Sequence, residues 1–152
     1  LLLRTLALSP TLDRLDGDLS AFRALATAAA REIGSAVVLV NAAAPERQWL
    51  NTRVPPGEAL PAIPPDSIAF NAMREGRTVA RAMLTPREPA TIIGGIVVPV
   101  LRNGQVLGAL GAPLGPERLS RALAAPGAMR PGDAIFALTP DFRIIARTPA
   151  AT

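Results

Sequence analysis

Two apolar segments joined by an Asn-Gly pair constrain the fold of this chain more than any other feature. Residues 91–101 and 105–114 are rich in Ile, Val, Leu and Gly, and Asn103-Gly104 lies between them. An Asn-Gly pair in this setting predicts a type I′ turn, whose backbone twist matches that of a β-hairpin. Because so short a turn joins only antiparallel strands, the sheet must contain antiparallel pairing here. Pro99 cannot donate to a neighbouring strand, so we expect an edge, a bulge or an unpaired position there.

An amphipathic helix is predicted in the N-terminal quarter of the chain. Asp18 is a suitable N-terminal cap, and Gly34 is a suitable C-terminal stop. A second helix start is indicated upstream by Ser9-Pro10. After Asp18 the apolar residues recur at helical spacing and predict that the helix packs on a sheet; they are Leu19, Phe22, Leu25, Ala26, Ala29 and Ile33.

The other segments complete an α+β pattern. The loop at 54–65 contains five prolines, which fix the backbone and remove hydrogen-bond donors. Asp66 is a candidate cap for a short helix that ends at Gly76, and Gly115-Pro116 starts another. Additional strands are predicted over 36–40, 47–53, 78–84, 134–138 and 143–146. Helices grouped against one antiparallel sheet define the α+β class, and this order of elements is PAS-like.

Composition argues for a packed domain and against most catalytic chemistry. The chain has 152 residues, of which 49% are hydrophobic and 18% are charged, so one domain with a sizeable core is expected. It has no Cys, His or Lys, so its five serines have no ordinary base to activate them. Gly94-Gly95 lacks the context of a nucleotide-binding motif, and no acidic cluster has metal spacing. We therefore expect no enzyme activity and no cofactor, and the interleaved charges do not predict nucleic-acid binding.

The stretch from Arg47 to Arg53 is the candidate ligand-binding strand. Strict alternation would place Trp49, Asn51 and Arg53 on one face and the residues between them on the other. On that face Arg53 would hold a carboxylate or another oxyanion, Asn51 would orient it and Trp49 would wall the pocket. The alternative is turn chemistry, in which Asn51 and Thr52 satisfy backbone groups and Arg53 covers apolar surface with its stem.

Three residues further along extend this hypothesis. Arg81 and Met83 share one face of the strand at 78–84, and Arg87 lies in the loop that follows. If the faces align, Arg53 and Arg81 form a basic pocket mouth. Because no acidic residue is expected beside it, the pocket would favour organic anions over amines. The alternative for each arginine is a role in surface solubility.

Four segments follow a pattern that spans nearly the whole chain. They read LALSPTLDRLDGDLSAFRALA, VVLVNAAAPERQWLNTRVPPGEALP, IIGGIVVPVLRNGQVLGALGAPLGPERLSRAL and DAIFALTPDFRIIART. Together they resemble the extracytoplasmic Cache (PAS-like) sensor domains of bacteria. The tyrosines and pocket aspartate of the amino-acid-binding Cache domains have no counterpart here, which argues against that ligand class.

The resemblance implies a single sensor domain over 1–152, with entry helices at 1–34, a PAS-like sheet with helices at 35–124, and a hairpin at 125–152 that starts a membrane-proximal part. Such domains lie in the periplasm between two membrane helices, commonly in a sensor histidine kinase and less often in a chemoreceptor or diguanylate cyclase. The resemblance implies a small-molecule ligand whose binding shifts the N-terminal helix, and a homodimeric, membrane-tethered parent protein. The C-terminal strands are then an exposed edge or pair with a second chain.

Two observations bear on that tether and on the rival hypothesis. The chain opens on Leu1-Leu2-Leu3 without an initiator Met, so we expect it to follow a membrane helix in a longer protein. Its own longest apolar run, 92–101, is too short to span a bilayer, which takes roughly 20 residues. The rival is a ligand-free dimerisation module, in which the arginines are only surface residues.

Overall fold

The computed structural model describes residues 1–84, 92–124, 134–138 and 144–148. The chain divides into two compact units, each described here by itself. The first unit comprises Leu1–Ala80 with Ile96–Pro113, and the second comprises Arg81–Gly95 with Leu114–Thr152.

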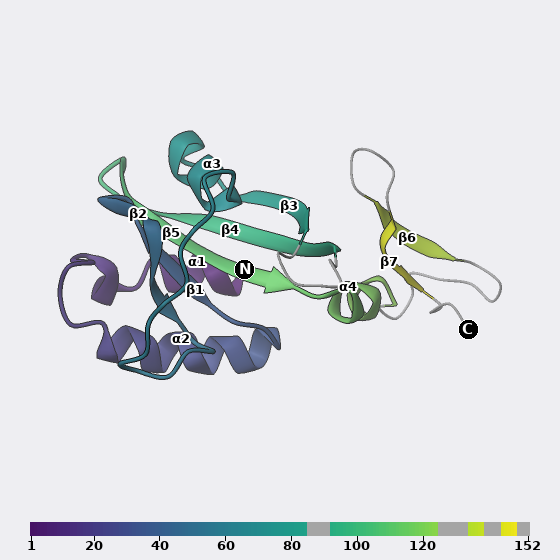
Figure 1. Ribbon diagram of the computed structural model, residues 1–152, viewed down its shortest axis with the longest axis horizontal. Coiled ribbons are helices and arrows are strands. Elements are labelled where there is room, and N and C mark those ends of the chain that lie inside the picture. The colour runs from purple at the N-terminus through teal and green to yellow at the C-terminus, as the bar shows by residue number, and fades with distance from the viewer. Residues whose placement is uncertain (85–91, 125–133, 139–143, 149–152) are drawn as a thin grey trace. The chain divides into compact units, whose positions relative to one another are not determined.

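Helices and one main antiparallel sheet make up the described chain, so the predicted α+β class is confirmed (Figure 1). The five-stranded sheet has the order β2-β1-β5-β4-β3, and β6 and β7 form a separate pair. The elements are α1 (Leu2–Ala7), a 3-10 helix η1 (Pro10–Leu12), α2 (Ser20–Ile33), β1 (Val38–Asn41), β2 (Ala44–Asn51), α3 (Ile68–Glu75), β3 (Val79–Leu84), β4 (Ile92–Arg102), β5 (Gln105–Leu114), α4 (Pro116–Leu123), β6 (Ile135–Leu138) and β7 (Ile144–Thr148).

The hairpin of β4 and β5 has the turn that the sequence predicts. Asn103 has a φ of 50° and Gly104 a φ of 77°, and positive φ at both central residues defines a type I′ turn. Since β4 lies between β5 and β3, the suggestion that Pro99 lies on an edge strand is wrong.

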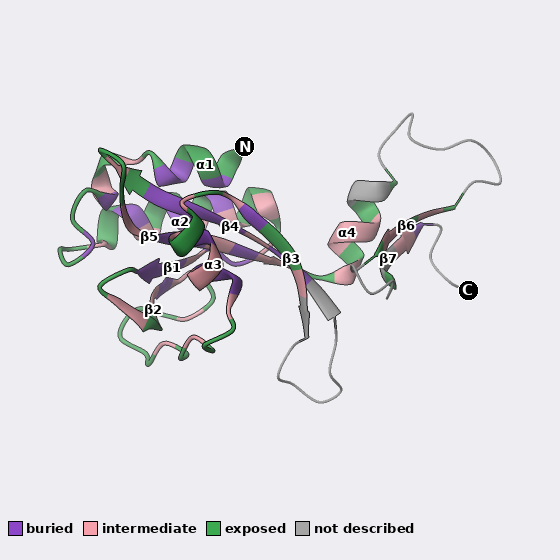
Figure 2. Ribbon diagram, turned by 90° about the horizontal axis from the view of Figure 1, so that it is seen from above, coloured by how far each residue is buried: buried purple, intermediate pink, exposed green. Residues whose placement is uncertain are grey.

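One face of the sheet in the first unit is covered by α1 and α2 (Figures 1 and 2). Phe22 of α2 is fully buried there, and Gly34 ends the helix with a φ of 66°, as predicted. Leu25 was expected on the same buried stripe, but 48% of it is exposed, whereas the next residue, Ala26, is fully buried. The sequence predicted entry helices at 1–34 but did not identify α1 as a helix of its own. The hydrophobic cluster of buried residues comprises Leu3, Leu6, Ala7, Leu12, Leu15, Phe22, Ala26, Ala29, Val37, Leu39, Leu50, Val98, Val100, Leu110 and Ala112.

The helix α3 lies on the opposite side of the sheet from α1 and α2 (Figure 1). Ser67, and not the predicted Asp66, caps it, because the Ser67 hydroxyl accepts a hydrogen bond from the backbone nitrogen of Ala69 at 3.3 Å. Ile68, Ala69 and Ala72 are buried, and Gly76 ends the helix with a φ of 61°. Helices of the first unit therefore lie on both sides of the sheet (Figure 1).

The second unit combines α4 with the β6–β7 hairpin. The two strands pair antiparallel, as predicted, and α4 packs against both of them. Gly94 at the start of β4 leaves room for Leu119 of α4, since a Cβ at Gly94 would lie 3.1 Å from its Cδ1 atom. Whether the hairpin pairs with a second chain stays a prediction.

In the described part of the chain, every helix is too short or too polar to cross a membrane.

Candidate functional site

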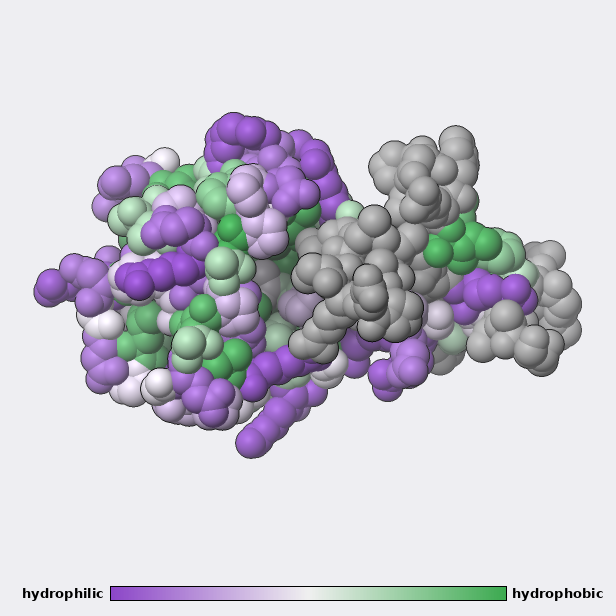
Figure 3. Space-filling view, in the orientation of Figure 1, coloured by the Kyte–Doolittle hydropathy of each residue, from purple (hydrophilic) through white to green (hydrophobic). Residues whose placement is uncertain are grey.

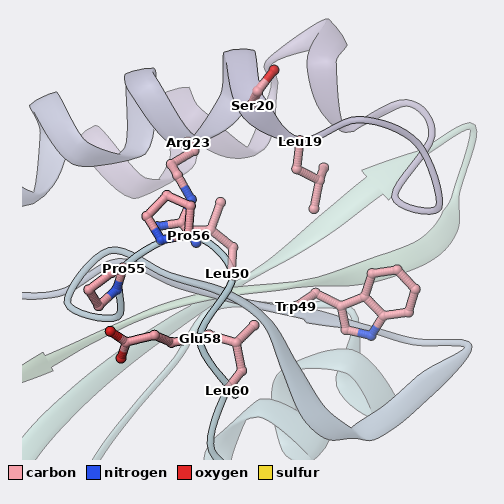
Figure 4. Close-up of a pocket in the computed structure, with 10 residues that line it drawn as sticks. Leu19, Ser20, Arg23, Trp49, Leu50, Pro55, Pro56, Glu58 and Leu60 are labelled. Carbon is pink, nitrogen blue, oxygen red and sulfur yellow. The ribbon is translucent and has the colours of Figure 1, made fainter.

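A pocket of about 370 Å³ lies in the first unit, between the start of α2, the strand β2 and the loop that follows β2 (Figure 4). This volume lies within the range of roughly 300–1,000 Å³ that is usual for small-molecule sites. Its lining combines apolar side chains with one cation, one anion and one hydroxyl, so it can bind a ligand by shape and by charge. The lining residues are Leu19, Ser20, Arg23, Trp49, Leu50, Pro55, Pro56, Gly57, Glu58 and Leu60.

Leu19, and not the predicted Asp18, holds the N-cap position of α2, but Asp18 still bonds to the first residue of the helix. The Asp18 carboxylate accepts hydrogen bonds from the backbone nitrogen of Ser20 at 2.8 Å and from its hydroxyl at 2.9 Å. These two bonds lower the pKa of Asp18 from its ordinary value of 3.8, and the bond from the backbone nitrogen has the larger effect. The first turn of α2, which carries Ser20 and Arg23, therefore starts at a defined position beside the pocket.

A β-bulge in β2 brings Trp49 to the pocket. Leu39 of β1 pairs with Leu50, but the next residue, Val40, pairs with Gln48, so Trp49 is an extra residue in the strand. A bulge re-aims side chains, and here both Trp49 and Leu50 line the pocket. The prediction that these two residues lie on opposite faces is therefore wrong, because strict alternation fails at a bulge.

The indole of Trp49 is held by its own strand. The guanidinium carbon of Arg47 lies 5.3 Å from the ring centroid, within the range of a cation–π interaction. The indole Nε1 donates to the carbonyl of Ala44 at 3.4 Å. Trp49 is thus a preorganised apolar wall rather than a loose surface residue.

The third wall is a proline-rich turn that runs back along β2. The backbone nitrogen of Glu58 donates to the carbonyl of Pro55 at 3.3 Å, and Gly57 has a φ of 88°. Proline followed by a glycine of positive φ is typical of a type II turn, and this turn projects Glu58. Further along, the backbone nitrogen of Ile63 donates to the backbone carbonyl of Glu46 at 2.8 Å, so the loop covers the edge of β2.

Arg23 joins the α2 wall to the start of this loop. Its Nη1 donates to the carbonyl of Val54 at 3.1 Å and to that of Asn51 at 3.4 Å. Arg23 projects from the helix and Glu58 from the loop, so the two charged side chains border the pocket from different elements (Figure 4). The sequence argument for an anionic ligand concerned the mouth proposed for Arg53 and Arg81, neither of which lines this pocket, so it stays a prediction. In the pocket described here, the acidic Glu58 accompanies the basic Arg23.

The polar groups predicted around Trp49 are engaged in turn chemistry. The Asn51 side chain accepts from the backbone nitrogen of Arg53 at 2.9 Å and donates to Gln48 at 2.8 Å. The Thr52 hydroxyl accepts from the backbone nitrogen of Val37 at 3.0 Å. The turn interpretation is therefore confirmed for Asn51 and Thr52. Arg53 is exposed, and neither it nor Asn51 lines this pocket, so their roles in ligand binding stay predictions.

The remaining predicted site residues belong to other parts of the chain. Arg81 is exposed on β3, in the second unit. Met83 also belongs to β3, but its side chain, like the whole of Arg87, lies outside the described residues. The basic mouth proposed for Arg53 and Arg81 thus stays a prediction.

Sequence reasoning missed Arg23 and Glu58. The signal for Arg23 was available, since it lies four residues after Leu19 and so beside the apolar stripe of the helix. The signal for Glu58 was the Pro56-Gly57 pair, which predicts the turn that carries it. What the sequence lacked was the fact that these two elements meet. No group of three or more acidic residues that could hold a metal ion occurs in the described ranges.

Comparison with known proteins extends the structural assignment. No protein-family model and no curated protein matches this sequence. Solved structures do match: the ligand-binding domain of the Campylobacter jejuni chemoreceptor Tlp3 in complex with L-valine has a TM-score of 0.65 and 16% sequence identity. The ligand-binding domain of the Pseudomonas fluorescens chemoreceptor CtaA in complex with L-serine has a TM-score of 0.66 and 19% identity.

This chain has the fold of these chemoreceptor ligand-binding domains. The match covers 97% of this chain in both cases, and 60% of the Tlp3 chain and 62% of the CtaA chain. The chain thus spans about three fifths of the length of the solved structures that it matches. The predicted α+β sensor-domain fold is confirmed at this level.

Proposed function

We propose that this chain is a small-molecule sensing domain on the extracytoplasmic side of a bacterial membrane receptor. The observation that carries the proposal is the pocket that Trp49, Arg23 and Glu58 help to line. Similarity of fold to two chemoreceptor ligand-binding domains supports the same function. In this role the domain binds a ligand and undergoes a population shift, and it does no chemistry of its own.

The pocket supports a ligand with a carboxylate and an ammonium group. Arg23 offers a guanidinium, which pairs well with a carboxylate, and Glu58 offers a carboxylate for an ammonium group. Trp49 and Leu50 supply apolar surface for the side chain of the ligand. An amino acid has this arrangement of groups, and the similar structures of Tlp3 and CtaA are complexes with the amino acids L-valine and L-serine. Arg23 and Glu58 would then take the place of the tyrosines and the aspartate of the amino-acid-binding Cache domains, which have no counterpart in this chain. An organic anion, the ligand class that the sequence favoured, would use Arg23 alone.

The output of the parent protein is the second part of the proposal. The resemblance of the sequence to Cache sensor domains favours a membrane-bound sensor histidine kinase. The similarity of the structure to Tlp3 and CtaA favours a chemoreceptor. In both, a ligand stabilises one arrangement of the sheet and the N-terminal helices, and a homodimer carries the change across the membrane.

A ligand-free dimerisation module is the rival function. On the face shown in Figure 3, hydrophilic and hydrophobic side chains are mixed over the described surface of the first unit. An obligate dimer interface is instead expected to be broad and apolar. This mixed surface, together with the pocket, favours the sensor over the dimerisation module. A dimer formed through another face is compatible with a sensor.

Titration calorimetry tests the proposal. The purified chain is titrated with L-valine, L-serine and L-leucine, and with small dicarboxylates. Saturable binding of one molecule per chain supports a sensor, and the class that binds decides between an amino acid and an organic anion. If no compound from a broad screen of both classes binds, and none raises the melting temperature, the dimerisation module is the better account.

A further inference from the structure

A single arginine joins the N-terminal helix to the far end of the sheet. Arg102 is the last residue of β4, and its Nε donates to the Asp13 carboxylate at 2.5 Å. Its Nη1 donates to the carbonyl of Ala7 at 3.0 Å, and its Nη2 donates to the carbonyl of Ser9 at 2.7 Å. One side chain thus contacts three groups that are about 90 residues away in sequence, within the first unit.

One of these acceptors, the carbonyl of Ala7, is a group that a helix end leaves unsatisfied, whereas the carbonyl of Ser9 also accepts from the backbone nitrogen of Leu12 at 3.0 Å. Ala7 is the last residue of α1, and the carbonyls at a helix C-terminus have no partner within the helix. A cation at this end also interacts favourably with the helix dipole. Only 23% of the Arg102 side chain is exposed, against 57% for Asp13, so solvent screens these contacts less than it screens an ordinary surface pair.

The helix that Arg102 contacts is short and is held by tertiary contacts. It has six residues, and no side chain caps its N-terminus. So short a helix is not stable by itself and depends on tertiary contacts. Besides the contacts of Arg102, the apolar residues Leu3, Leu6 and Ala7 are buried in the hydrophobic cluster. An element of this kind can open locally while the rest of a domain stays folded.

We propose that Arg102 is a latch that fixes α1 to the β4–β5 hairpin, and that release of the latch frees α1 without unfolding the sheet. The sheet keeps its own core on the same face, built around Phe22, Val100 and Leu110, which are all fully buried. In the sensor proposed above, the latch regulates the helix through which the signal leaves. That last consequence rests on the proposed function, whereas the latch itself does not.

Hydrogen exchange of the whole chain, without any ligand, tests the latch. In Arg102→Gln, amides in residues 2–9 are expected to exchange about tenfold faster than in the wild type, because charged hydrogen bonds to the helix end are lost. Amides of β1 and β5 are expected to change much less. Arg102→Lys keeps the charge but cannot contact three acceptors at once, so it is expected to give an intermediate rate.

Arg77→Gln is the matched control. Arg77 also forms an ion pair, with Glu75 at 2.5 Å, but 72% of its side chain is exposed, and its removal is expected to leave exchange in residues 2–9 unchanged. The latch is refuted if Arg102→Gln gives the same exchange as this control, or if exchange rises equally in β1 and β5. If Arg102→Gln does not fold, Asp13→Asn takes its place: a smaller increase confined to residues 2–9 supports the latch, and no increase refutes it. Since no ligand is used, a negative result here leaves the proposed function standing.

Discussion

Gly108 of β5 lies directly against the backbone carbonyl of Val40 on β1. A Cβ atom at Gly108 would overlap that oxygen and would lie 2.8 Å from the Cδ1 atom of Leu15. Gly108 pairs with Asn41 in the centre of the sheet, so neither strand can move aside freely. The position therefore requires glycine because of close packing, without any need for an unusual backbone conformation.

Gly108→Ala is expected to destabilise the domain by about 1–3 kcal/mol, the usual cost of overpacking a core. Chemical denaturation followed by the fluorescence of Trp49, the single tryptophan, measures this. Gly17→Ala is the control, because a Cβ there would lie 3.5 Å from the carbonyl of Arg14, an ordinary contact distance. Equal stability of the two variants would show that β1 and β5 separate easily.

Phe22 and Leu25 of α2 form a second matched pair. Phe22 is fully buried, whereas Leu25 is 48% exposed. Phe22→Ala is expected to cost about 3–5 kcal/mol, as for a large side chain removed from a core. Leu25→Ala is expected to change the stability by less than about 0.5 kcal/mol, since alanine favours the helix and little surface is lost. Comparable losses in both variants would mean that a partner covers Leu25 in solution.

The contrast between these two residues shows how far periodicity predicts the fold. Spacing identified α2 and its stop at Gly34, and the Asn103-Gly104 turn identified the central hairpin, because both signals depend on neighbouring residues alone. Leu25 fits the same spacing and is exposed, since its burial depends on the angle at which the helix meets the sheet. That angle is set by the packing of distant strands, which no local pattern reports.

Asp18 gives a prediction about pH. Its hydrogen bonds from the backbone and hydroxyl of Ser20 favour the charged carboxylate and so lower its pKa below 3.8. Near pH 3.8 the folded state then binds fewer protons than the unfolded chain, so this contribution to stability is present above that pH and is lost as the pH falls through the folded pKa. Asn at this position can still accept a hydrogen bond from the backbone nitrogen of Ser20 but cannot titrate.

The free energy of unfolding of the wild type and of Asp18→Asn is therefore compared from about pH 6 down to about pH 3. The free energy of unfolding of the wild type, relative to that of the variant, is expected to fall as the pH decreases towards the lower end of this range. The other carboxylates titrate equally in both proteins, so their contributions cancel. Curves that stay parallel at all pH values would contradict the lowered pKa of Asp18.

The candidate site was less predictable than the fold. Trp49 was predicted to wall a pocket with Asn51 and Arg53 on the ground of strict alternation, but it lines a pocket without them, at a bulge between Gln48 and Leu50. Its role in ligand binding stays a prediction. A bulge depends on the register with β1, which the sequence of β2 does not contain. Arg23 and Glu58 come from a helix and a turn that are 35 positions apart, and their meeting is a property of the tertiary structure.

The two hypotheses for the binding residues differ in the arginine that they use, and this gives the last prediction. If the pocket is the site, Arg23→Gln and Glu58→Gln each weaken binding of the amino acid identified by titration by about tenfold or more, since each removes a charged hydrogen bond. Arg53→Gln, at an exposed position outside the pocket, is expected to leave the affinity nearly unchanged.

Ligand analogues assign the two charges separately. If L-valine binds, 3-methylbutanoate lacks its ammonium group, and its affinity is expected to fall in Arg23→Gln and to be insensitive to Glu58→Gln. Isobutylamine lacks the carboxylate and is expected to show the reverse pattern. Because Arg23 also holds the loop through Val54, Arg23→Lys serves as the control that keeps a positive charge there. Loss of binding in Arg53→Gln, with Arg23→Gln unaffected, would instead place the ligand on the Asn51–Arg53 turn and would exclude the pocket as its site.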